Sequence, residues 1–179
     1  MPERAVQMLA SLYTAVLRTH KVPGAWKTGV VAMLFKKGDK EQCKNYRGLT
    51  LLSTIGKVFE RVLLNRLSAH MERHDLLHEL QYGFRGERGT EDLVVAMQQI
   101  LEKNPTSCAV FVDIRKAYPT VFRDGLFTKL AQKGVNGDIW GMLQNWYTGL
   151  SAKVAVAGET GADGYPVDTG LMEGAILSP

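Results

Sequence analysis

Cysteine, long apolar runs and the common catalytic loop motifs are scarce or absent in this sequence, and each absence argues against a class of protein. The 179 residues include only Cys43 and Cys108, neither in a CxxC pair, so neither a zinc site nor a disulfide framework is expected. The longest apolar run, residues 30–35, is far too short to cross a membrane. No signal peptide, GxSxG elbow, P-loop or Rossmann fingerprint occurs. We therefore expect a protein of a reducing intracellular compartment, nucleus or cytoplasm, without a membrane partner.

The remaining composition is typical of a folded domain. Hydrophobic residues make up 45% of the chain and charged residues 22%, which argues against disorder and against a coiled coil. The length suits one domain or a piece of a larger one, and no repeat or linker divides it. A single α+β unit is the fold class that we expect.

Positive charge gathers in the first half of the chain. Residues 1–90 hold 15 lysines and arginines against 8 aspartates and glutamates, a net charge of +7, whereas residues 91–179 hold 7 against 10, a net charge of −3. A basic region beside an acidic one fits a polyanion-binding surface next to a metal site. Solvated helix faces would produce the same modest separation and stay an open alternative.

Hydrophobic periodicity and breaker residues predict a mixture of helices and short strands. Helices are expected over residues 2–20, 54–74, 90–103, 123–133 and 137–150, and strands over residues 29–35, 46–52, 107–112, 153–157 and 165–170. The first of these strands reads as buried, and it pairs with the second in a hairpin whose tip is basic. Residues 81–89 read as a glycine-rich loop.

Several residue types in this pattern could carry chemistry. Asp113 directly follows an expected strand and is a hard oxygen ligand suited to Mg²⁺, although strand-end aspartates also make turns. The basic hairpin offers Lys36, Lys37 and Arg47, which could grip a triphosphate or a nucleic-acid backbone, or could simply be a solvated turn. In the loop after them, Phe84 could stack on a base or anchor the core.

Four segments stand in order along residues 20–179. The first runs over residues 22–67, with VP at 22–23, WK at 26–27, FKKGD at 35–39, NYRGLTLL at 45–52, KVFE at 57–60 and NRL at 65–67. The others are QYGFR at 81–85 followed by Thr90, FVDIRKAY at 111–118 and GLMEGAILSP at 170–179. In sequence, order and spacing they resemble the reverse transcriptase domain of a non-LTR (LINE-type) retrotransposon.

The resemblance implies a right-hand polymerase fold of reverse transcriptase type. About residues 1–106 would be an N-terminal helix and the fingers, and about residues 107–179 a partial palm, truncated after the fourth motif. The family's paired aspartates would follow Pro179. The implied activity is that of an RNA-directed DNA polymerase, a nucleotidyltransferase that adds dNTPs to a primer 3′-OH. Its implied partners are an RNA template, a DNA primer, dNTP and the missing palm and thumb.

The resemblance also assigns roles in catalysis. Asp113 matches the first catalytic aspartate, which holds two Mg²⁺ ions with help from the carbonyl of Ile114. Tyr118 matches the steric gate that excludes a ribose 2′-OH. Glu173 and Gly174 would line the nucleotide pocket. One such carboxylate cannot hold two metal ions, so the fragment alone is expected to be inactive. A remnant that only binds nucleic acid or protein is the alternative.

Substrate binding falls to two further groups of residues. Arg47 matches the arginine that contacts the incoming triphosphate, with Lys36 and Lys37 beside it in the fingers. The residues expected to contact nucleic acid are Gln81, Phe84 and Arg85.

Four positions depart from the family pattern. Gly48 and Met172 each stand where proline is usual, Pro119 where a second aspartate is common, and Glu173 where glutamine is usual. A carboxylate at position 173 would repel a triphosphate unless it is paired or protonated.

Overall fold

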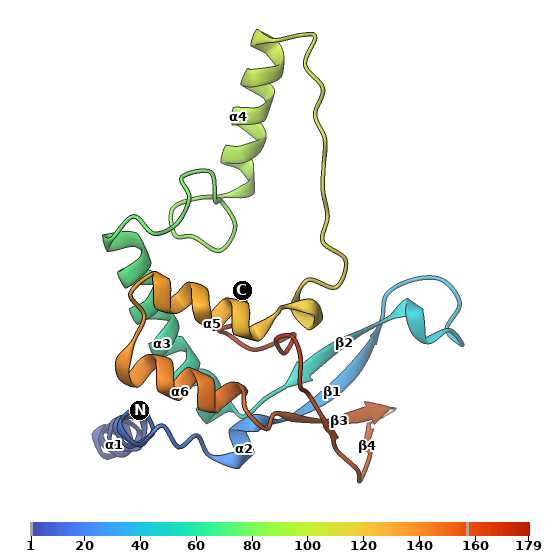
Figure 1. Cartoon of the computed structure of the whole chain (residues 1–179). Coiled ribbons are helices and arrows are strands. Elements are labelled where there is room, and N and C mark those ends of the chain that lie inside the picture. The colour runs from blue at the N-terminus through green and yellow to red at the C-terminus, as the bar shows by residue number, and fades with distance from the viewer. Residues whose placement is uncertain (1, 157) are drawn as a thin grey trace.

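A computed structural model describes residues 2–156 and 158–179, in which one mixed sheet lies to one side of a group of helices (Figure 1). The strands are β1 (Thr28–Phe35), β2 (Tyr46–Leu51), β3 (Ser151–Val156), β4 (Glu159–Thr160) and β5 (Tyr165–Pro166). Their order is β2-β1-β3-β4, with β5 also paired to β3. β1 runs antiparallel to β2 and parallel to β3. The sheet therefore joins strands from both sides of the expected boundary near residue 106.

The helices agree closely with the periodicity of the sequence. They are α1 (Glu3–Thr19), α2 (Gly24–Lys27), α3 (Thr54–Arg73), α4 (Thr90–Lys103), α5 (Arg123–Gln132) and α6 (Gly137–Tyr147), and two short 3-10 turns are η1 (Cys43–Asn45) and η2 (Tyr118–Thr120). All five predicted helices are confirmed, while the short α2 was not predicted. Ser53 caps α3 by accepting a hydrogen bond from the amide of Gly56. Among the described helices, none has the length and apolar character needed to cross a membrane.

Aromatic rings from four helices form the centre of the core. Phe59 of α3 is fully buried, and its ring centroid lies 5.0 Å from that of Tyr13, 5.6 Å from that of Trp26 and 5.9 Å from that of Trp146. Gly56 lets α3 approach closely, because a Cβ there would lie 3.2 Å from the Trp26 ring. Rings packed at these distances add attraction beyond their buried area. The cluster ties α1, α2, α3 and α6 together.

The strand predicted at residues 107–112 is wrong. These residues lie in an extended segment that, with α4, projects away from the remainder of the molecule (Figure 1). Val110, Phe111, Val112 and Ile114 are 70–88% exposed. A strand requires hydrogen bonds from a neighbouring strand, and within the described residues this segment pairs with none. Its apolar, β-branched composition is therefore not sufficient to make it a strand.

Two other strand predictions need correction. The strand at residues 29–35 exists as β1, but it is not buried throughout, because Met33, Leu34 and Phe35 are 38–50% exposed. Of the strand predicted at residues 165–170, only the short β5 forms. The carbonyls of Val167, Thr169 and Gly170 accept hydrogen bonds from the side chain of Arg123 instead of from a neighbouring strand. Ala157, the last residue of the strand predicted at 153–157, lies outside the described residues.

We expect Phe59→Ala to lower the free energy of unfolding by about 3–5 kcal/mol, because it leaves a cavity among three aromatic rings. Urea unfolding followed by tryptophan fluorescence measures this change. Val58→Ala on the exposed face of the same helix is the matched control, and it should alter stability by no more than about 0.5 kcal/mol. Equal effects of the two substitutions would contradict the proposed core.

Candidate functional site

The fourth motif forms a loop, residues 170–178, which we call the C-terminal loop. Its first residues are bound to η2: the amide of Gly170 donates to the carbonyl of Val121 at 3.1 Å, and the amide of Leu171 donates to that of Tyr118 at 2.7 Å. Gly170 has φ +70°, and a Cβ there would lie 2.3 Å from the carbonyl oxygen of Pro119. Only glycine fits this approach. The loop thus meets the segment that contains Tyr118.

The middle of the C-terminal loop lies against β2. The amide of Thr50 donates to the carbonyl of Glu173 at 2.8 Å. Gly174 has φ +114°, and a Cβ there would lie 2.6 Å from the carbonyl oxygen of Thr50. The glycine predicted to line a nucleotide pocket therefore packs directly on the strand that carries Arg47.

Arg47 and Glu173, 126 positions apart in the chain, form an ion pair. The Nε of Arg47 donates to Oε1 of Glu173 at 2.6 Å, and a terminal guanidinium nitrogen contacts the same oxygen. The arginine side chain is 60% exposed and the glutamate side chain 24%. An exposed pair of this kind is weak, so an incoming anion could displace the carboxylate. The pairing also neutralises the one acidic departure from the family pattern.

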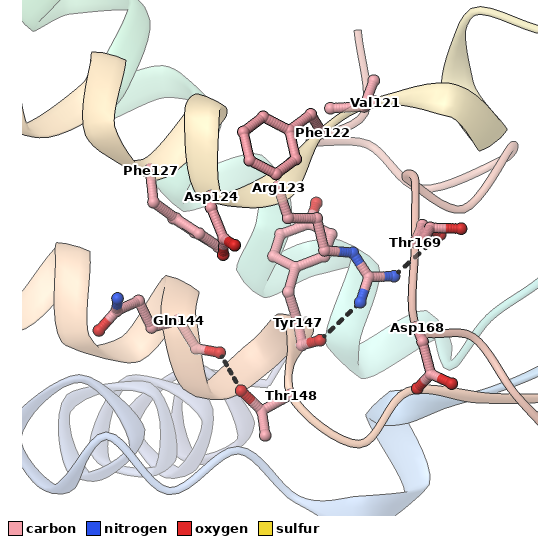
Figure 2. Close-up of a pocket in the computed structure, with 10 residues that line it drawn as sticks. All are labelled: Val121, Phe122, Arg123, Asp124, Phe127, Gln144, Tyr147, Thr148, Asp168 and Thr169. Atoms are coloured by element: carbon pink, nitrogen blue, oxygen red, sulfur yellow. Dashed lines mark hydrogen bonds between the residues drawn. The ribbon is translucent and has the colours of Figure 1, made fainter.

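Arg123 holds the start of the C-terminal loop to α6. Its guanidinium donates to the carbonyls of Gly170 at 2.7 Å, Tyr147 at 2.9 Å, Val167 at 2.8 Å and Thr169 at 3.2 Å. Figure 2 shows the guanidinium pointing toward the backbone of Tyr147 and Thr169. It also lies over the Tyr147 ring, 5.5 Å from the centroid.

A cavity of about 320 Å³ opens beside Arg123 and also exposes the carboxylates of Asp124 and Asp168 (Figure 2). Burial lowers the pKa of Arg123 and raises that of Tyr147, which is consistent with an enclosed position for both. Since the guanidinium is occupied by backbone carbonyls, its role here is structural. The sequence pattern did not identify Arg123, which occurs only as the first residue of a predicted helix.

Other predicted residues lie apart from the C-terminal loop. Lys36 and Lys37 are exposed at the tip of the β1–β2 hairpin. Asp113 and Ile114 are exposed on the extended segment. Within the described residues, no group of three or more histidine, cysteine, aspartate or glutamate side chains gathers where it could hold a metal ion. As arranged, Asp113 alone does not fit the two-metal site that the resemblance implies.

The loop of residues 81–89 is held by Arg85. Its Nε and a terminal nitrogen donate to the two carboxylate oxygens of Glu72 at 2.9 and 2.6 Å, a bidentate pair that lowers the pKa of Glu72. Gln81 donates to the carbonyl of Gly83 at 3.1 Å. Phe84 is 78% exposed at the edge of a cavity of about 620 Å³, so the alternative that it anchors the core is wrong. Its ring is free for stacking.

Comparison with known proteins gives one consistent result. Residues 35–179 match the family described as reverse transcriptase (RNA-dependent DNA polymerase). Among curated relatives, a probable RNA-directed DNA polymerase from transposon BS of Drosophila melanogaster is 30% identical over 188 residues, covering 100% of this chain and 20% of the relative. The corresponding protein from transposon X-element of the same fly is 30% identical over 184 residues, and the RNA-directed DNA polymerase from mobile element jockey 28% over 189 residues, with the same coverage.

Replacing Arg123 by lysine should lower the free energy of unfolding by about 2–4 kcal/mol, because one ammonium group cannot serve four carbonyls from two segments. Thermal unfolding followed by circular dichroism measures the loss. Arg115→Lys, in an exposed turn, is the matched control and should be nearly neutral. A neutral Arg123→Lys would mean that these carbonyls do not depend on the guanidinium.

Proposed function

The chain belongs to the reverse transcriptase family, and we propose that it forms the fingers and the first part of the palm of an RNA-directed DNA polymerase from a LINE-type retrotransposon. The chain spans about 20% of the length of the curated relatives that it matches. The proposed fingers extend to about residue 106 and the proposed palm begins at about residue 107. The observation that carries the proposal is the contact between Arg47 on β2 and Glu173 in the C-terminal loop.

This contact marks the proposed nucleotide pocket. Arg47 supplies a guanidinium whose bidentate geometry suits a phosphate group. Lys36 and Lys37 on the same hairpin add positive potential that attracts a polyanion. Tyr118, assigned from its motif as the steric gate, is tied to the same loop through its backbone, because the amide of Leu171 donates to its carbonyl. The paired glycines of the loop let its backbone lie directly against η2 and β2, which brings the loop beside Arg47.

The remaining roles are assigned from the motifs. Asp113 and the carbonyl of Ile114 are proposed to hold Mg²⁺ together with further carboxylates, which the described residues do not gather around Asp113. Gln81, Phe84 and Arg85 are proposed to contact an RNA template or its DNA primer, with the exposed ring of Phe84 stacking on a base.

The ion pair makes a sharp prediction for anion binding. Glu173→Gln should tighten binding of a dNTP by about two- to fivefold, because the triphosphate no longer has to displace the carboxylate of Glu173 from Arg47. Arg47→Ala should weaken it by about tenfold or more. Both are measured by nuclear magnetic resonance titration at fixed ionic strength.

The control for net charge is Glu159→Gln, which removes one exposed carboxylate on β4. It should change dNTP affinity much less than Glu173→Gln does. Unchanged or weaker binding in Glu173→Gln would contradict a pocket between Arg47 and the C-terminal loop.

The chain by itself should not extend a primer. With RNA template, DNA primer, dNTPs and Mg²⁺, we expect no incorporation by these 179 residues, because in the described part of the chain Asp113 belongs to no group of three or more acidic, histidine or cysteine side chains that could hold metal ions. Gel-resolved primer extension checks this. Sustained Mg²⁺-dependent incorporation that disappears in Asp113→Ala would overturn the prediction and would require a different arrangement of the palm.

A further inference from the structure

Glu60 of α3 is a buried carboxylate that lies at the end of KVFE in the first motif and has been assigned no role. It is 2% exposed, and its Oε2 accepts hydrogen bonds from the amide of Ile176 at 2.5 Å and from that of Leu177 at 3.3 Å. Within the described residues it forms no salt bridge with a lysine or arginine. The groups that donate hydrogen bonds to it are thus backbone amides of the C-terminal loop.

A carboxylate is costly to bury, and hydrogen-bond donors reduce that cost. Burial raises the pKa of Glu60, while the two backbone amides and the positive charge of Lys57 on the same helix lower it by less. Tyr147 of α6 is the other titratable group that faces it, with Arg123 of α5 over its ring. Hydrogen bonds from amides to an ionised acceptor are about twice as strong as neutral ones.

The C-terminal loop can transmit this contact to the proposed nucleotide pocket. The hydroxyl of Ser178 donates to the carbonyl of Met172 at 2.8 Å, and the amide of Ala175 donates to the same carbonyl at 3.1 Å. These bonds close the loop into a compact turn. One side of the turn is Glu173, held on β2, and the other is the pair of amides held by Glu60.

We propose that Glu60 is a positioning residue that holds the C-terminal loop between α3 and β2, so that Glu173 and Gly174 keep their place beside Arg47. The meaning of this for nucleotide binding rests on the proposed function. The contact itself does not, so the two are tested separately.

Amide hydrogen exchange tests the contact. At a pH above the raised pKa of Glu60, Glu60→Gln keeps the shape of the side chain but loses its charge, and protection at Ile176 and Leu177 should fall by about five- to tenfold. Amides of the aromatic core, such as that of Leu63, should keep their protection. The matched control is Glu79→Gln, an exposed glutamate in the loop after α3, which should leave both sets unchanged. Unchanged protection at the two amides in Glu60→Gln would overturn the proposal.

An apolar variant separates positioning from stability. Glu60→Leu removes the buried carboxylate but leaves the amides of Ile176 and Leu177 without their acceptor, so it should lower global stability only modestly, because the cost of desolvating the carboxylate is removed at the same time. Protection at Ile176 and Leu177 should still fall by tenfold or more. A loss of protection spread evenly over the chain would mean that Glu60 supports the whole fold and not the loop, and would overturn the positioning role.

The pH dependence gives a readout that packing alone would not move. Because the pKa of Glu60 in the folded state is raised above its ordinary value of 4.5, the native state binds the extra proton in the window above that value. Its contribution to stability is fully present below pH 4.5 and is lost as pH rises through the folded pKa. The wild-type chain should lose stability relative to Glu60→Gln across this window. If the free energies of unfolding of wild type and Glu60→Gln varied with pH in parallel, that would contradict the buried position of the Glu60 carboxylate.

Titration with dNTP completes the test. If the loop forms the proposed pocket, Glu60→Gln should weaken binding by about the factor by which loop protection falls, when both proteins also carry Glu173→Gln so that no carboxylate competes for Arg47. Normal binding with reduced protection would overturn the link to the pocket but not the contact. No binding by the wild type would contradict the proposed function, while hydrogen exchange would still decide the role of Glu60.

Discussion

Burial of Phe59 is the constraint on which the remainder of the structure depends. Its ring packs against three others contributed by α1, α2 and α6, and such dense packing leaves α3 little freedom to rotate about its axis. The neighbouring Glu60 then faces the C-terminal loop, where its charge meets two backbone amides. A non-directional hydrophobic contact in this way orients a directional polar one. The loop is positioned by the same helix that completes the core.

The C-terminal loop is held by polar contacts to distant parts of the chain as well as by Met172, which packs into the core. Arg123 binds the carbonyl of Gly170, Glu60 binds the amides of Ile176 and Leu177, and the amide of Thr50 binds the carbonyl of Glu173. Arg47 and Glu173 add a weak ion pair at the proposed nucleotide pocket. Glutamate at position 173, unusual for the family, is accommodated because its charge has a partner.

The extended segment with Asp113 shows the limit of local sequence patterns. Residues 107–112 resemble β1 and β3 in composition but do not form a strand. β1 and β3 do form strands, because each has a neighbouring strand whose backbone completes its hydrogen bonds. Val110, Phe111 and Val112 remain exposed without such a neighbour. Whether Asp113 lies at the end of a strand thus depends on strand pairing, and the composition of the preceding residues alone does not decide it.

The sequence by itself determined the helices, the β1–β2 hairpin and the membership of the reverse transcriptase family. Helical periodicity is local, and the family motifs are read directly as residue types in order. Tertiary structure alone decided the partners of Glu60, Arg123 and Glu173. Two of these side chains bind backbone groups, which carry no sequence signal, and the third binds an arginine 126 positions away. Contacts of this kind arise only when packing brings remote segments together, so no local pattern could have revealed them.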